Sequence, residues 1–125
     1  MTALLLTAIG CQSGPAAGLT AAESMWGNER ETLTILADGA RFEGLCLEGT
    51  LPGKIVIDER GNFSAHGTLR HVGGARREDD AQQEAVFSGT IRGDTMTLTI
   101  TAANGDELLK STLKKGARGT AHPCA

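Results

Sequence analysis

Few side chains of this chain have the types and spacing that catalysis or metal binding requires. None of the serines lies in a Gly-x-Ser-x-Gly setting, and no glycine-rich loop opens a helix to cradle a phosphate. The three histidines, His66, His71 and His122, show no ligand spacing with Cys46 or Cys124 that matches a zinc module. We therefore expect a protein that is not an enzyme and that uses no metal or cofactor.

The N-terminal stretch carries the most informative motif. Thr2–Ile9 is apolar apart from two threonines and, at eight residues, is too short to span a bilayer. It leads into Ala8-Ile9-Gly10-Cys11, which resembles the lipobox of bacterial lipoproteins. The family usually has Leu where this chain has Ala8, and a basic n-region that is missing here. The competing interpretation is a short buried strand, or a tail with an incidental cysteine.

The resemblance to bacterial lipoproteins implies where in the cell the protein is located. Residues 1–10 would be a signal-like segment, and Cys11 would become the lipidated first residue of the mature protein. Residues 11–29 would then form a tether, with small residues such as Gly and Ser at its start. This implies anchorage to the membrane of a bacterial cell envelope, facing the periplasm or the exterior.

Lipidation at Cys11 would also account for an odd number of cysteines. The chain has three, and acylation of one leaves Cys46 and Cys124 as natural disulfide partners in an oxidising compartment. Such a bond would tie the end of the chain to an early strand.

The longest segment without apolar periodicity is Val72–Gln83, which predicts a surface loop. Loops of this length carry function more often than tight turns do, although a solvent-exposed loop without a function fits equally well. The acidic residues lack the alternating spacing and turn glycine of a calcium loop. The candidate partner-contact residues in the loop are Arg76, Arg77, Glu78, Asp79 and Asp80.

Ala85–Ala102 specifies the clearest β-hairpin. A turn at Gly93-Asp94 pairs Phe87 with Ile100, and it brings every apolar residue of both strands to one face. A slip by one residue would expose that whole face to water, so the register is well specified. A second turn, at Asn104-Gly105, extends the meander and places Leu109 opposite Ile100.

Two further hairpins are expected earlier in the chain. Glu31–Gly44 turns at Asp38-Gly39, which places Ile35 opposite Phe42. Lys54–Asp58 then pairs with the strand that starts at Phe63, through a three-residue loop that ends in a left-handed Gly61.

Ahead of these hairpins, Thr20 and Glu23 have the spacing of a capping box and predict a short helix. We expect Trp26, which follows, to close one end of a barrel.

Composition agrees with one β domain over residues 30–125. Seventeen glycines and many threonines favour turn-rich β structure. We expect an antiparallel meander of about seven or eight strands, closed as a small lipocalin-like barrel or folded as a sandwich, with a last strand after Gly116. The expected core consists of Leu33, Ile35, Phe42, Ile55, Ile57, Phe63, Leu69, Phe87, Ile91, Met96, Leu98, Ile100, Leu109 and Leu113.

The charge of the chain narrows the range of partners. A net charge of −3, with 12 basic residues interspersed among 15 acidic ones, argues against nucleic acid. We therefore expect a non-enzymatic envelope binding or accessory protein, an inhibitor or assembly partner among the options, that acts on another protein through surface loops. The alternative is a carrier of a small apolar ligand inside the barrel. It is disfavoured because we expect no polar residue to face the interior, whereas ligand pockets usually contain a few.

Overall fold

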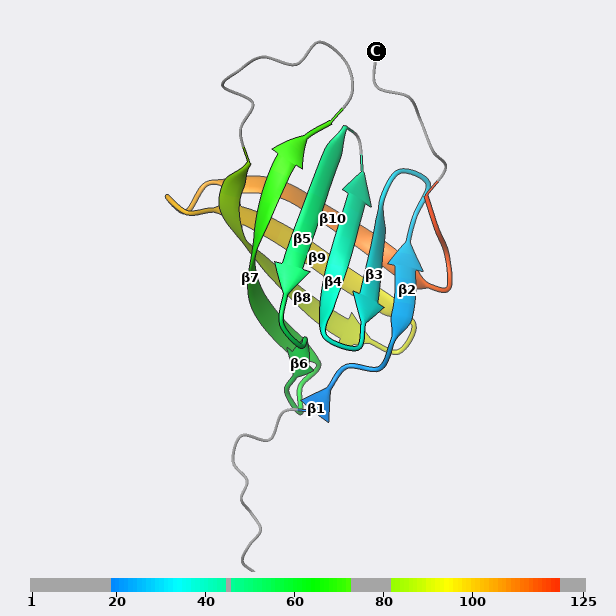
Figure 1. Cartoon of the computed structure of the whole chain (residues 1–125). Coiled ribbons are helices and arrows are strands. Elements are labelled where there is room, and N and C mark those ends of the chain that lie inside the picture. The colour runs from blue at the N-terminus through cyan, green and yellow to red at the C-terminus, as the bar shows by residue number, and fades with distance from the viewer. Residues whose placement is uncertain (1–18, 45, 73–81, 120–125) are drawn as a thin grey trace, which may run out of the picture.

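The chain folds into a closed eight-stranded antiparallel β-barrel with a two-stranded sheet beside it (Figure 1). The computed structural model describes residues 19–44, 46–72 and 82–119. These ranges contain no helix, so the expected all-β fold is confirmed, and it is a barrel rather than a sandwich. Around the barrel the strands follow the order β10-β2-β3-β4-β5-β7-β8-β9, while β1 pairs with β6. The strands are β1 (Leu19–Thr20), β2 (Ser24–Gly27), β3 (Thr32–Leu36), β4 (Gly39–Gly44), β5 (Leu47–Pro52), β6 (Val56–Ile57), β7 (Asn62–His71), β8 (Gln83–Arg92), β9 (Thr95–Ala102) and β10 (Glu107–Lys115).

The hairpins on both sides of β9 have the expected registers. Phe87 lies opposite Ile100 across the Gly93-Asp94 turn, where Gly93 adopts a φ of +63°. Leu109 also lies opposite Ile100, and Leu113 opposite Met96. The apolar residues of the three strands therefore share the inner face, except Val86 and the exposed Leu108.

The β3–β4 hairpin has a different register from the expected one. Leu33, not Ile35, lies opposite Phe42, and Leu36 lies opposite Gly39. The turn is therefore at residues 37–38, one position earlier than expected. Such a change moves each pair by two residues and leaves the same side chains on the inner face, so the apolar pattern does not distinguish the two registers. Gly39 follows the turn because a Cβ there would lie 2.5 Å from the Leu51 carbonyl oxygen.

The expected pairing of residues 54–58 with β7 is wrong. Only the base of that hairpin forms, with Asp58 N–H donating to Asn62 O at 2.9 Å and Gly61 left-handed at φ +88°. Beyond this turn, β7 pairs with β5 in the wall of the barrel, while β6 pairs with β1. The buried Ile55 still belongs to the core, so the run keeps its packing role without its expected partner.

The eighth strand is β2, which comes from the segment where we expected a short helix. Trp26 pairs with Leu33 of β3, and its side chain is 4% exposed. Burial of this large ring outweighs a weak local helix signal. The strand that we expected after Gly116 is absent from the described residues, and the barrel closes between β10 and β2 instead. The β domain thus begins ahead of residue 30.

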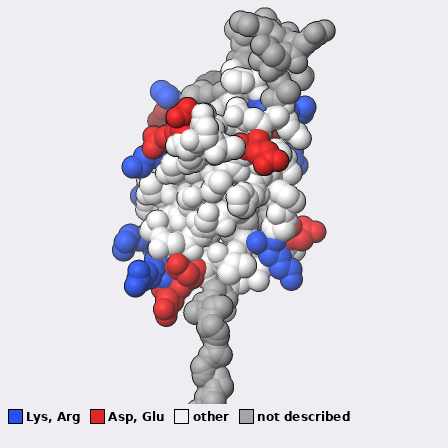
Figure 2. Space-filling model, turned by 90° about the vertical axis from the view of Figure 1, so that its left-hand side faces the viewer, with Lys and Arg blue, Asp and Glu red and all other residues white. Residues whose placement is uncertain are grey.

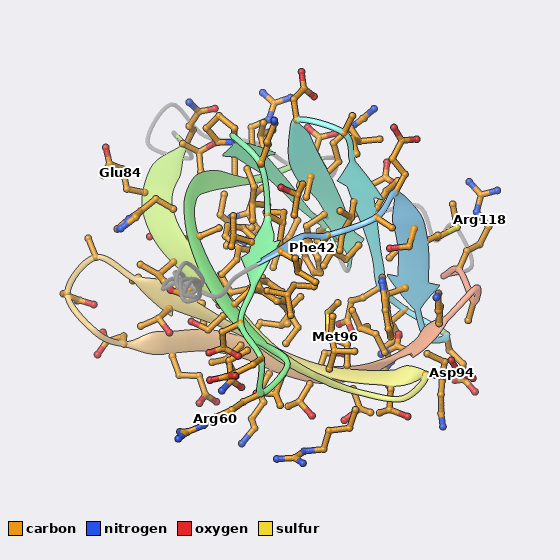
Figure 3. All side chains as sticks on the ribbon, turned by 90° about the horizontal axis from the view of Figure 1, so that it is seen from below. Phe42, Arg60, Glu84, Asp94, Met96 and Arg118 are labelled. Atoms are coloured by element: carbon orange, nitrogen blue, oxygen red, sulfur yellow. The ribbon has the colours of Figure 1, made fainter. Side chains whose placement is uncertain are left out.

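The barrel interior is filled by side chains. Seen from below, Phe42 and Met96 point inward, whereas Arg60 and Glu84 point outward (Figure 3). The rings of Phe42 and Phe87 pack with centroids 6.3 Å apart at 59°. All fourteen expected core residues are buried or packed against the core, and the buried set also includes Trp26, Ala40, Leu51 and Ala85.

Glycines on the inner face make room for the phenylalanine rings. A Cβ at Gly89 would collide with the Phe63 ring, and one at Gly49 would lie 2.8 Å from the Phe87 ring. Missing side chains on the inner face therefore let two bulky rings lie close to the sheet.

Candidate functional site

The barrel closes at the seam between β10 and β2, and these two strands share fewer paired residues than any other neighbouring strands of the barrel. Only two residue pairs join these strands, Lys114 with Gly27 and Lys115 with Trp26. After Gly27 the chain leaves the sheet, so the next part of β10 faces the turn 28–31. Side chains of that turn, rather than a strand, complete the contact with β10.

Asn28 organises this turn. Its Oδ1 accepts hydrogen bonds from the backbone N–H groups of Arg30 at 2.7 Å and Glu31 at 2.8 Å. Its Nδ2 reaches the Ser111 Oγ at 2.8 Å and the Thr112 carbonyl oxygen at 3.0 Å, both on β10. One side chain thus shapes the turn and fastens it to the far side of the seam.

Glu31 places a carboxylate inside this seam. The residue is only 6% exposed, and a Cβ on Gly44 would lie 2.6 Å from its Cγ and 3.0 Å from the Phe42 ring. Its Oε1 accepts a hydrogen bond from the Ser111 Oγ and lies 3.1 Å from the Asn28 Nδ2. The other oxygen, Oε2, accepts no hydrogen bond from a described residue, and no described cation pairs with the group.

The expectation that no polar residue faces the interior is therefore wrong. Glu31 has the same strand parity as Leu33 and Ile35, and Ser111 that of Leu109 and Leu113. Two-residue periodicity alone places both polar side chains on the inner face. The signal was present in the sequence, and it required the same counting that identified the core.

The turn and β10 line an open polar groove. Its volume is about 550 Å³, and it is lined by residues 28–31 on one side and 110–112 on the other. Glu29 and Glu31 contribute two carboxylates, and Arg30 and Lys110 contribute two cations. The groove can therefore offer both acceptors and donors to a ligand.

The C-terminal end of the described chain supports the turn from behind. The backbone N–H of Gly119 donates to Thr32 Oγ1 at 2.6 Å, and a Cβ on Gly119 would lie 3.0 Å from the Glu31 nitrogen. Residues 117–119 also pass Gly27 so closely that a Cβ there would lie 2.6 Å from the Ala117 carbonyl oxygen. The turn is thus held between β10 and this segment.

The other end of the barrel has a smaller, more apolar hollow of about 230 Å³, whose lining includes Trp26, Ile35 and Ile57. Nearby, the pKa of Asp58 is lowered, chiefly by the hydrogen bond from the Asn62 backbone N–H and further by the N–H and charge of Arg60. These bonds shape the loop that follows β6, and they suggest a structural role.

One side of the barrel carries no charge across its middle. Figure 2 shows this side, with Lys, Arg, Asp and Glu gathered above and below an uncharged surface. A shallow groove of about 340 Å³ on the outer face of β7, β8 and β9 is lined largely by hydroxyl groups, among them Ser64, Ser88, Thr90, Thr97 and Thr99. Threonine favours strands for its packing alone, so this groove needs no ligand to explain it.

Most site residues expected from the sequence lie outside the described residues. This holds for the lipid-anchor residue Cys11, for Cys124 and for the loop residues 76–80. Cys46 is described: it follows β4 with a φ of +63°, and its carbonyl oxygen accepts a hydrogen bond from Val72 N–H at 2.9 Å. His66 is exposed on the outer face.

Comparisons with protein-family models, with curated proteins and with solved structures find no match to this chain. Within the described ranges, no helix is long and apolar enough to cross a membrane.

Proposed function

We propose that this chain is a non-enzymatic, lipid-anchored binding module of the bacterial envelope. Cys11 carries the anchor in this proposal, and the connections at the far end of the barrel contact a partner protein. The observation that carries it is the position of two segments at opposite ends of the barrel. Leu19 enters beside β6 at one end, while Val72 and Gln83, which flank the longest connection, lie at the other (Figure 1).

The register of β7 supports this polarity. Asn62, close to β6, pairs with Thr90 near the β8–β9 turn, whereas Leu69 pairs with Gln83 at the start of β8. A tether that leads into Leu19 would hold the loop of residues 76–80 away from the membrane. Charged groups in such a position affect encounter rate and partner choice.

The filled interior favours a surface-acting protein over a carrier of apolar ligands. Phe42 and Phe87, the largest fully buried side chains of the core, have no exposed surface. An eight-stranded barrel is just wide enough for side chains to fill it. To carry a ligand inside the barrel, the protein would have to open this packing.

The chemistry of the groove is also that of binding. Ser111 Oγ donates to a carboxylate, Glu31, and not to the imidazole that would activate a serine nucleophile. The hydroxyl is thus engaged as a donor, which supports a non-enzymatic role.

A Cys46–Cys124 disulfide is part of the proposal. Gly119 is fixed beside Thr32, which pairs with Glu43, three residues ahead of Cys46. Cys124 lies five residues beyond Gly119, and five residues can span about 17 Å when extended. The pairing is therefore within reach of the chain.

The loop is tested by replacing residues 74–80 with a Gly-Ser linker and by repeating a cross-linking pull-down from the envelope. We expect fewer recovered partners at unchanged thermal stability. The matched control is the double variant Glu59→Gln/Arg60→Gln, which neutralises a loop at the anchor end. Unchanged recovery with the linker, or equal loss with the control, contradicts the assignment of the binding face.

The anchor is tested separately by labelled palmitate in a bacterial host. We expect label on the wild-type chain and none on Cys11→Ala. Equal labelling of both chains, or none on either, refutes the anchor.

A further inference from the structure

We propose that the groove between the turn 28–31 and β10 binds a small zwitterionic amine, whose ammonium group is held by the Glu31 carboxylate. This proposal rests neither on the loop residues 76–80 nor on a lipid anchor.

The buried carboxylate is the first reason. Glu31 is more than nine-tenths buried, yet the described residues provide no cation for it and no donor for Oε2. The Asn28 amide has two N–H groups but three acceptors within reach, on Glu31, Ser111 and Thr112. Its shorter contacts go to β10, so Glu31 receives little of its donor capacity. A buried carboxylate satisfied on one side only is a strong acceptor for a cation.

The number of available oxygens selects the type of cation. Ser111 and Asn28 both contact Oε1, which leaves Oε2 as the carboxylate oxygen without a described donor. A guanidinium group binds best through two parallel bonds to both oxygens, whereas an ammonium group is a compact point charge with three donors. A calcium ion requires six to eight oxygens, and the part of the chain that the structure describes holds no cluster of three or more His, Cys, Asp or Glu side chains. The ammonium group is the best match.

The rim selects what accompanies the ammonium group. Arg30 and Lys110 line the same groove as Glu31, as does Glu29, so a ligand held at Glu31 has cationic side chains near it that a negatively charged group can pair with. A ligand that carries a carboxylate a few bonds from its ammonium group can pair with the buried acceptor and with one of these two cations. The groove volume of about 550 Å³ suits a small molecule of this class.

Three probes of similar size test the proposal on the wild-type chain: 4-aminobutyrate, butylammonium and butyrate. Each is titrated at millimolar concentration while the amide NMR signals of residues 28–31 and 110–112 are followed. We expect 4-aminobutyrate to bind most tightly, butylammonium more weakly, and butyrate not at all. No shift with any probe, or equal shifts with butyrate and 4-aminobutyrate, overturns the proposal. A response confined to added Ca²⁺ also overturns it.

Variants assign the two charges. Glu31→Gln keeps the shape of the side chain and should weaken 4-aminobutyrate binding by about tenfold or more, since it removes a charge-assisted hydrogen bond. Lys110→Gln should reduce 4-aminobutyrate to the level of butylammonium. The control is Glu48→Gln, which removes a surface carboxylate paired with Arg70 and should leave binding unchanged. Unaltered binding in Glu31→Gln refutes the site, and should that variant not fold, the probe series and Lys110→Gln still decide.

Discussion

Replacing Asn28 by Ala tests whether the seam network contributes to the stability of the barrel. The substitution removes two hydrogen bonds within the turn, to Arg30 and Glu31, and two that reach β10. At roughly 0.5–1.5 kcal/mol for each bond, and with some of the loss recovered by water, we expect the free energy of unfolding to fall by about 2–4 kcal/mol. The loss should be large because these bonds supplement a closure of only two residue pairs.

Asn104→Ala is the matched control. Asn104 also shapes a turn, with Oδ1 accepting from the Asp106 backbone N–H at 2.9 Å, but its side chain is exposed and its side-chain bonds stay within its own turn. We expect a loss of about 0.5–1 kcal/mol.

Urea denaturation and thermal melting measure both variants. For a domain of this size, 1 kcal/mol corresponds to a shift in Tm of about 4–8 °C, so Asn28→Ala should melt roughly 10 °C below Asn104→Ala. Equal losses in the two variants would show that Asn28 only shapes its turn, and the reasoning about the seam would then be wrong.

Three further predictions concern packing, titration and cross-linking. Gly89→Ala drives a methyl group into the Phe63 ring and should lower stability by about 1–3 kcal/mol in urea denaturation. An unaltered midpoint would show that the ring moves freely. The side-chain carboxyl signal of Asp58 should titrate below the usual value because its charged form accepts backbone hydrogen bonds, so its stabilising effect is present above about pH 4 and is lost as the pH falls through its folded pKa. A normal midpoint in NMR would contradict this. Cys46→Ser and Cys124→Ser should each cost about 2–4 kcal/mol under oxidising conditions, and the double variant no more than either one. Additive losses would mean that the two residues are not bonded to each other.

Local patterns predicted the β8–β9 and β9–β10 hairpins because each has a short turn and alternating apolar residues, which in β10 begin at Leu109 after a register shift. Phe87 and Ile100 can meet in only one way once the turn at Gly93 is set. The β3–β4 hairpin lacked such a constraint, because two registers that differ by two residues bury the same side chains.

Pairings between distant segments could not be predicted in this way. The neighbours of β7 are set by closure of the whole barrel, and β5, with Gly49 and Pro52, has no clear strand pattern of its own. Likewise, the strand at Ser24–Gly27 is short and forms because Trp26 fills the interior beside Leu33. These outcomes depend on contacts that no local window contains.

The candidate site was missed for a different reason. The parity of Glu31 and Ser111 indicated the inner face, but charged and hydroxyl side chains are usually exposed, and the apolar residues alone were used to define the interior. The polar members of an inward-facing series are the ones that distinguish a site from a core.

The seam joins closure of the barrel to the proposed binding. A buried carboxylate contributes little net stability, and well-packed apolar residues often do as well or better in such a place. Stability alone therefore gives a poor account of Glu31, whereas an ammonium ligand would supply the missing donor at Oε2. Because the site forms only when the turn 28–31 lies against β10, a ligand bound there would stabilise the folded barrel in proportion to the logarithm of its concentration. The seam between β10 and β2, where the barrel has the fewest strand pairs, is thus also the place where a bound ligand would stabilise the fold most directly.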